Sequence, residues 1–352
     1  MGNGDADHAQ WGRPQQWDEA KQPRPKYACT AARPCSELAA ETAAAMAAAS
    51  IAFAATGSND DATYAAELRS NAASLFEFAA SNRGLYHLSI TDAAKFYKSW
   101  GDDDDLGWAA AWLARSTADA GKKASYIAAA ESYAAAVGWE GAEQSWDGKT
   151  PGLNLLLYKL TGKQQHKTMV EKFLAKWMPG EGNTVAYTPQ GLAWYMKWGP
   201  LRYAANTALI AVGYADALDS SGSGGAGGGA DARAREYTSW ARGQIQYMLG
   251  HANTLGPNGA GFSYLVGYGD HFPRKVHHQM ATCPKAPAAC DWNTFNDESK
   301  PNAYTLYGAL VGGPGKDDSF DDKRSDYIKN EVTLDYNAGF TSVLAALIQF
   351  DA

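Results

Sequence analysis

The sequence predicts an all-α protein made of paired helices that are joined by long loops. Ala-rich stretches with helical spacing of their apolar residues recur along the 352 residues, and Ala is the best helix former. Few segments alternate between apolar and polar residues as a strand would. The loops carry most of the Trp, Asp and His side chains, and loops of this length in a compact domain are usually functional.

The elements follow in order from local signals. The first 35 residues are polar and contain four prolines, so we expect a loop there. Ser36 is the expected N-cap of an Ala-rich helix over 38–53. Strand structure is expected only in short pieces such as 261–266. Further helices are expected over 62–81, 93–98, 106–117, 124–137, 153–160, 166–177, 192–196, 203–218, 233–249 and 337–350.

A Gly/Ser-rich tract at 219–230 interrupts the helical pattern. It offers almost no side chains that could pack, so we interpret it as a flexible insertion within one domain that covers 1–352. The alternative is a linker between two domains, but the helices on both sides share one pattern.

Composition excludes several classes of function. The chain has 31 Lys+Arg against 38 Asp+Glu, a net charge of −7, which argues against a partner with a phosphate backbone such as nucleic acid. The longest weakly polar run, 38–56, contains Glu41, so we expect no membrane span. Aromatic residues make up 12% of the chain, which fits either a large core or a cleft that stacks flat rings such as sugars.

The four cysteines form two close pairs, Cys29 with Cys35 and Cys283 with Cys290. Zinc sites often use tighter spacings, so two small disulfides are favoured over a metal site. Disulfides imply an oxidising compartment, yet the first residues lack the basic and apolar regions of a signal peptide. Either the thiols are reduced, or the start of the protein is missing.

The segment 320–338 carries the strongest chemical signal. Asp322 and Glu331 are flanked by aromatic residues and lead into an apolar helix. Apolar neighbours can raise the pKa of a carboxyl group toward neutrality, as an acid or base needs. The alternative is helix capping together with a solvated acidic loop.

This segment resembles the second signature of glycoside hydrolase family 9, the inverting cellulases. Phe320, Asp322, Tyr327, Glu331, Thr333, Asn337 and Ala338 match every position of that signature. The resemblance implies an (α/α)6 barrel, with Glu331 as the general acid and Asp322 as a supporting active-site residue. It also implies that Tyr336 reaches the sugar next to the bond that is cut.

Other segments resemble the family's substrate-binding loops. Trp198 and Arg202 lie in a Trp-Gly-x-Leu-Arg-Tyr-like motif, and the resemblance implies ring stacking for Trp198 and hydroxyl contacts for Arg202. Asp7-His8 with Trp11-Gly12-Arg13-Pro14 resembles an early binding loop, which places His8 and Trp11 in the cleft. Trp100 corresponds to a further sugar platform.

The family's first signature is present in altered form. His277 occupies its His position and is implied to bond the substrate, but Gln279 replaces the Arg two residues later. Gln279 is therefore expected to contact substrate without the charge or the five donors of a guanidinium.

A structural calcium ion is the one cofactor that the resemblance implies, and none is required for the chemistry. Asp104, Asp105 and Asp147 match acidic positions that bind calcium in related enzymes, and oxygen ligands suit this ion. The alternative is that Asp104 and Asp105 only place negative charge at a helix N-terminus.

Inversion also needs a basic carboxylate. In the family it lies in an Asp-Ala-Gly-Asp motif, which this sequence lacks; Asp5-Ala6-Asp7-His8 is followed by the Trp11 loop and is identified as part of that loop instead. We therefore expect a barrel that is incomplete at its N-terminus, with the signal peptide of a secreted enzyme lost together with the base.

The expected function is an endoglucanase that hydrolyses internal β-1,4-glucosidic bonds of cellulose or related glucans. The alternatives are a non-catalytic glucan-binding remnant, which the altered signature favours but the intact Glu331 disfavours, and a helical interaction scaffold, which leaves the Trp-rich loops unexplained.

Overall fold

The computed structural model describes residues 3–20, 23–220 and 231–351, which form two compact units. Unit 1 comprises Met1–Asp7 and Arg24–Phe173, and unit 2 comprises His8–Pro23 and Leu174–Ala352. The expected insertion at 219–230 lies outside the described residues except for Asp219 and Ser220.

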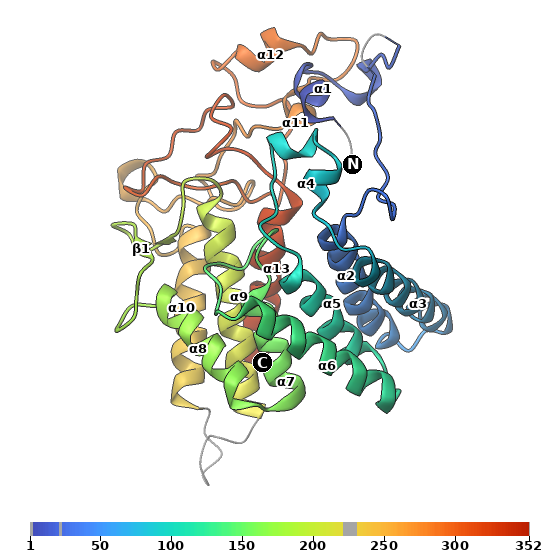
Figure 1. Ribbon diagram of the computed structural model, residues 1–352. Helices are drawn as coiled ribbons and strands as arrows, with labels where there is room; N and C mark the ends of the chain where they lie inside the picture. The colour runs from blue at the N-terminus through green and yellow to red at the C-terminus, as the bar shows by residue number, and fades with distance from the viewer. Residues whose placement is uncertain (1–2, 21–22, 221–230, 352) are drawn as a thin grey trace. The chain divides into compact units, whose positions relative to one another are not determined.

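Unit 1 is a stack of paired helices with an alanine-rich core. Helix α2 (Ser36–Ala54) packs against α3 (Asn59–Ser81) and α5 (Asp103–Ser116), as Figure 1 shows. Small side chains on the facing surfaces let these backbones approach closely. Gly107 on α5 likewise allows the close approach of α7 (Thr150–Thr161). A methyl group at Gly107 would lie 2.5 Å from Leu153 Cδ2. The buried alanines that α2 and α5 contribute to this core are Ala39, Ala40, Ala43, Ala44 and Ala47 on α2 and Ala109, Ala110 and Ala111 on α5.

The remaining elements of unit 1 are shorter or flank this core. They are the 3-10 helix η2 (Ala93–Lys95) and the α-helices α4 (Tyr86–Ser89), α6 (Ala120–Val137) and α7 (Thr150–Thr161). Helix α1 (Gly4–His8) begins in unit 1 and α8 (Gln164–Trp177) ends in unit 2. By length and composition alone α2 could cross a membrane, but its alanine face is packed as a core helix packs.

Unit 2 is organised around α9 (Pro200–Ser220), which packs against α10 (Ala232–Met248) and α13 (Leu334–Asp351). Gly339 allows the close approach of α13, because a methyl group there would lie 2.2 Å from Asn206 Oδ1 on α9. Two short strands, β1 (Ala186–Tyr187) and β2 (Ala193–Trp194), pair antiparallel. The smaller elements are η1 (Pro14–Gln16), η3 (Pro257–Gly259), α11 (Gln279–Thr282) and α12 (Trp292–Asn296).

The structure confirms the long helices and corrects several short predictions. The expected helix over 192–196 is strand β2, because Pro189 and Gly191 form a turn that returns the chain on β1. The expected strand over 261–266 is reduced to one bridge, from Leu265 to Leu310. The stretch 93–98 forms only the 3-10 helix η2, and the expected N-terminal loop contains α1 and η1.

One predicted cap is displaced by a residue. Cys35 is the N-cap of α2, and Ser36 is the first residue of the helix. The Ser36 hydroxyl bonds Gly84 O and the carboxylate of Asp102, so this side chain ties α2 to neighbouring segments and does not cap it.

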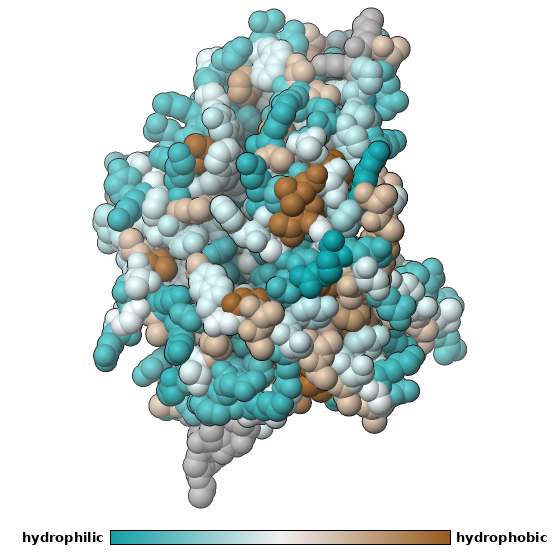
Figure 2. Space-filling view, viewed as in Figure 1, coloured by the Kyte–Doolittle hydropathy of each residue, from teal (hydrophilic) through white to brown (hydrophobic). Residues whose placement is uncertain are grey.

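Large apolar side chains reach the surface as separate spots. On the face in Figure 2, hydrophobic residues appear as small brown patches among hydrophilic and neutral ones. The most exposed aromatic side chains are Trp100 at 91% and Tyr307 at 78%. Scattered exposure of this kind is normal, so an aromatic residue matters for function only where its neighbours carry chemistry.

Candidate active site

Glu331 is held in unit 2 by pairing of its backbone. It pairs with His277 in a parallel bridge, and its neighbour Val332 pairs with Val311. Gly312 N–H donates to Glu331 O at 2.9 Å, and His277 N–H donates to Asn330 O at 2.9 Å. Three segments that are distant in sequence therefore meet at Glu331, three residues before α13 begins.

The carboxylate of Glu331 accepts two hydrogen bonds on one oxygen. Trp198 Nε1 and Tyr336 OH each lie 2.9 Å from Glu331 Oε2. Both donors are uncharged aromatic groups, and hydrogen bonds to a charged acceptor are stronger than bonds between neutral groups. Trp198 and Tyr336 were predicted to contact sugar, whereas here they also orient the proposed acid.

Aromatic rings surround this carboxylate. Tyr327 is 52% exposed, and its ring centroid lies 5.7 Å from that of Trp198 and 6.1 Å from that of His277. Trp198 is 40% exposed. Two partly open aromatic faces beside a carboxylate provide a surface on which the flat face of a sugar ring can stack.

His277 is fixed through its ring as well as its backbone. His277 Nδ1 lies 2.8 Å from Arg324 O. The ring makes edge contacts with Trp11 at 5.3 Å and with Phe295 at 5.9 Å between centroids. Trp11 itself is 5% exposed, so it packs against His277 and is not an open sugar platform in this arrangement.

Asp322 holds the loop that leads to His277. Its Oδ1 accepts from Lys275 N–H and its Oδ2 from Arg274 N–H, each at 2.8 Å. Both carboxylate oxygens of Asp322 therefore accept hydrogen bonds from backbone N–H groups, and these contacts fix the position of the 274–275 loop.

Arg202 is buried at 6% exposure and supports the same site from α9. Its Nη1 lies 2.6 Å from Asp335 Oδ2, and its guanidinium lies over the rings of Tyr203 and Tyr336, at 4.4 and 5.3 Å from their centroids. The expected contact of Arg202 with sugar hydroxyls is thus replaced, in this structure, by support of Tyr336.

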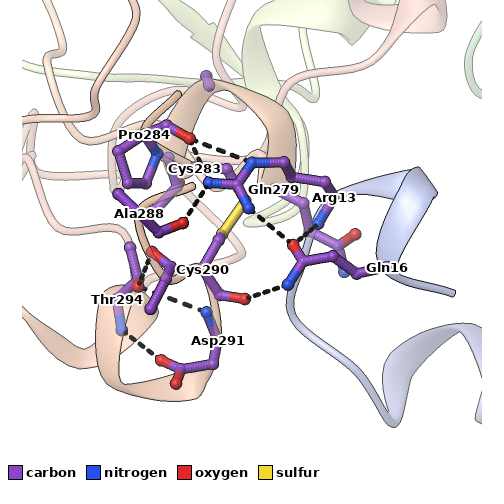
Figure 3. Close-up of a disulfide and its surroundings, with 12 residues drawn as sticks. Arg13, Gln16, Gln279, Cys283, Pro284, Ala288, Cys290, Asp291 and Thr294 are labelled. Carbon is purple, nitrogen blue, oxygen red and sulfur yellow. Dashed lines mark hydrogen bonds between the residues drawn. A yellow bond between two sulfur atoms is a disulfide. The ribbon is translucent and has the colours of Figure 1, made fainter. Parts of the chain in front are cut away.

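Gln279 also contacts protein. Its Nε2 donates to Gln10 O at 2.8 Å, which ties α11 to the segment that carries Trp11. Figure 3 shows the rest of this attachment: Arg13 donates to Pro284 O and Ala288 O, and Gln16 to Cys290 O. His8, at the end of α1, is exposed.

Both expected disulfides are present. Cys283–Cys290 closes the loop that accepts Arg13, and Cys29–Cys35 lies before α2. The prediction of disulfides is confirmed, and the alternative of a zinc site at these cysteines is excluded.

The remaining predicted residues lie in unit 1. Trp100 is almost fully exposed on the loop before α5. Asp105 is 1% exposed, and burial raises its pKa well above the usual value for Asp. Burial likewise raises the pKa of Asp104 and of Asp147.

Lys149 supplies the positive charge that faces these carboxylates. Its Nζ forms ion pairs with Glu41 and, at 3.7 Å, with Asp105 Oδ1, and its backbone N–H donates to Asp104 Oδ2 at 2.7 Å. Within the part of the chain that the structure describes, no three His, Cys, Asp or Glu side chains are grouped to hold a metal ion. The calcium ion that the resemblance implies stays a prediction.

Sequence reasoning missed three contributors to the site. Tyr327 stands in the signature and could have been assigned to the cleft from that pattern. Phe295 and Arg324 gave no signal, because a lone Phe and a basic residue in a polar loop look like ordinary packing and solvation.

Comparisons with known proteins agree with this geometry. The family model "Glycosyl hydrolase family 9" matches residues 1–344. An endoglucanase of Dictyostelium discoideum is 39% identical over 99% of this chain, which spans 44% of that protein.

Solved structures also match over the whole length of the chain. The endoglucanase of the termite Nasutitermes takasagoensis is 44% identical with a TM-score of 0.85, and 73% of it is covered. The cellulase Cel9M of C. cellulolyticum in complex with cellobiose is 30% identical with a TM-score of 0.81, and 72% of it is covered. The expected all-α, (α/α)6-type fold class is confirmed by these likenesses, and the chain belongs to glycosyl hydrolase family 9.

Proposed function

We propose that this chain carries the acid half of an inverting endoglucanase site that cleaves β-1,4-glucosidic bonds in cellulose or related glucans. The observation that carries the proposal is the carboxylate of Glu331, which is held by Trp198 Nε1 and Tyr336 OH beside partly exposed aromatic rings. The similarity to endoglucanases, one of them solved with cellobiose, supports a β-glucan as the ligand.

Glu331 is proposed to protonate the glycosidic oxygen as the bond to the leaving sugar breaks. Trp198 and Tyr336 fix the carboxyl group while this happens, so that the proton is delivered in a defined direction. Trp198 and Tyr327 offer faces on which a glucosyl ring stacks, and Trp100 offers another in unit 1.

Inversion requires a second carboxylate that activates water on the opposite face of the sugar. The carboxylates nearest to Glu331 in sequence are committed elsewhere: Asp326 accepts from Ile328 and Lys329 N–H, and Asp335 pairs with Arg202. Asp5 and Asp7 form ion pairs with Lys95 and Arg24 in unit 1. These contacts support a base outside the family-signature segment.

The two disulfides support a further proposal, that the protein acts in an oxidising compartment outside the cell.

The experiment is an assay of substrate class and stereochemistry. We expect hydrolysis of soluble cellulose but not of α-linked amylose, with the first product formed as the inverted anomer in proton NMR. Supplying a chain segment with the Asp-Ala-Gly-Asp motif should raise the rate far above that of residues 1–352 alone. Hydrolysis with retention, or equal rates on both polysaccharides, would contradict the proposal. Fast inverting hydrolysis by residues 1–352 alone would instead assign the base to Asp5 or Asp7.

A further inference from the structure

Arg324 is a buried charge that the proposed chemistry does not use. It lies two residues after Asp322, is 1% exposed, and directs its guanidinium into the segment 294–302. The guanidinium donates to Asn302 Oδ1 at 2.8 Å, to Phe295 O at 2.9 Å, to Asp297 O at 3.1 Å, to Lys300 O at 3.2 Å and to Thr294 O at 3.3 Å. All of these acceptors are uncharged oxygens. The N–H groups of one guanidinium therefore hold the whole segment 294–302 in place.

The backbone at Arg324 is also fixed by hydrogen bonds. Arg324 N–H donates to Glu298 Oε2 at 3.2 Å, and Ser325 N–H donates to Glu298 Oε1 at 2.8 Å. The same residue presents its carbonyl oxygen to His277 Nδ1 at 2.8 Å. The position of that carbonyl is therefore set by the guanidinium on one side and by Glu298 on the other.

This contact determines which nitrogen of His277 carries the proton. A carbonyl oxygen can only accept a hydrogen bond, so Nδ1 must be the donor. In the neutral ring Nε2 then has no proton and can accept a hydrogen bond. The Phe295 carbonyl binds the same guanidinium while the Phe295 ring contacts His277, so both restraints on the imidazole depend on Arg324.

We propose that Arg324 is a positioning residue that selects the Nδ1–H tautomer of His277 and thereby leaves Nε2 to accept a hydrogen bond from a sugar hydroxyl. Selection of the tautomer stands on the contacts above. Only the sugar hydroxyl rests on the proposed function. A lysine in place of Arg324 would keep the charge but could not reach acceptors spread over 294–302, since an ammonium group is a compact point donor.

The test uses histidine labelled with 15N in the full chain, and His277→Gln identifies the signals of the ring. In the wild type we expect the Nδ1–H tautomer. In Arg324→Lys we expect a mixture of tautomers and a fall in kcat/KM on soluble cellulose on the order of 10²-fold, the cost of a displaced active-site group. The matched control is Arg235→Lys, at an exposed position of α10, which should change neither quantity.

A folded Arg324→Lys protein with an unchanged tautomer would overturn the proposal. If Arg324→Lys does not fold, Glu298→Gln tests the proposal in its place. This substitution weakens the hydrogen bonds that the Glu298 carboxylate accepts from the 324–325 backbone, and it leaves the guanidinium of Arg324 in place. Glu298→Gln should shift the His277 ring signals in a folded protein, and unchanged signals would contradict the proposal. The tautomer is read without substrate, so a wild type that fails to cleave cellulose even when a segment with the Asp-Ala-Gly-Asp motif is supplied would refute the proposed function alone.

Discussion

Unit 1 pairs the buried carboxylate of Asp105 with the ammonium group of Lys149, whereas unit 2 keeps Glu331 half-buried and holds it with the neutral donors of Trp198 and Tyr336. Asp105 in unit 1 is 1% exposed, and its Oδ1 has no hydrogen-bond partner. A carboxylate in that setting is committed to an ion pair. A carboxylate held by uncharged groups beside open aromatic faces instead fits the role that is proposed for Glu331. The two clusters of carboxylates therefore differ in the kind of partner that holds them, a charged amine in unit 1 and neutral donors in unit 2.

The largest loss of stability should come from removing the buried ammonium group of Lys149 in unit 1. Lys149→Met leaves the buried Asp105 and the partly buried Glu41 without a counter-charge, and breaking a buried pair in this way costs about 3–5 kcal/mol. Urea unfolding should show this loss. The control is Lys163→Met, whose ion pair with Glu131 is 52% exposed on the lysine side and should cost under about 1 kcal/mol. Equal losses in the two variants would show that the buried cluster does not depend on Lys149.

A second effect concerns Glu37, which is 4% exposed in unit 1. Burial raises its pKa from 4.5 to about 7, although Tyr86 N–H donates to it. The folded state therefore binds this proton more tightly than the unfolded chain does, and the free energy of unfolding falls as the pH rises from about 4.5 to about 7.

Glu37→Gln removes that titration. The free energy of unfolding of the variant, relative to wild type, should rise across the same pH window by up to about 3 kcal/mol. Thermal unfolding at pH 4 and pH 8 measures the difference, with Glu77→Gln at an exposed position of α3 as the control. A difference that does not change with pH would contradict the buried, protonated state of Glu37.

A smaller effect is expected at the donors of unit 2. Tyr336→Phe and Trp198→Phe each remove one hydrogen bond to Glu331 Oε2, worth about 1.5–3 kcal/mol for a charged acceptor. Tyr336→Phe keeps its ring, so its kcat should fall about ten- to a hundredfold while its KM changes little. Trp198→Phe also replaces the indole with a smaller phenyl ring, so its KM should rise as well as its kcat fall. Tyr327→Phe keeps its ring contact with Trp198 and should leave kcat unchanged. A rise in KM with normal kcat would show that these groups bind sugar and do not orient Glu331.

The smallest effect tests calcium. Lys149 already pairs with Glu41 and Asp105, so EDTA should leave the midpoint of thermal unfolding unchanged. A lower midpoint in EDTA that calcium, but not magnesium, restores would establish the ion that the family resemblance implies.

The sequence was a good guide wherever a signal is local or repeated. Long Ala-rich helices such as α2 and α5 follow from propensity and period, and Glu331 follows from a spaced signature. The strand β2 was missed because two residues are too few to show the alternation of apolar and polar side chains that marks a strand. The turn at Pro189 and Gly191, which returns the chain onto β1, makes these residues a strand. The roles of Gln279, Asp322 and Arg202 could not be predicted, since their partners lie far away in sequence: Gln10, the 274–275 backbone and Asp335.

The most direct test of the central claim compares leaving groups in Glu331→Gln. A general acid is needed most when the departing sugar is a poor leaving group, and such groups contribute about 10²–10⁴-fold to the rate. The variant should lose that factor on cellotetraose, whereas its rate on an aryl cellobioside with an acidic phenol should stay near that of wild type, and cellotetraose binding should be retained. An equal loss on both substrates, or no loss on cellotetraose, would contradict the assignment of Glu331 as the acid.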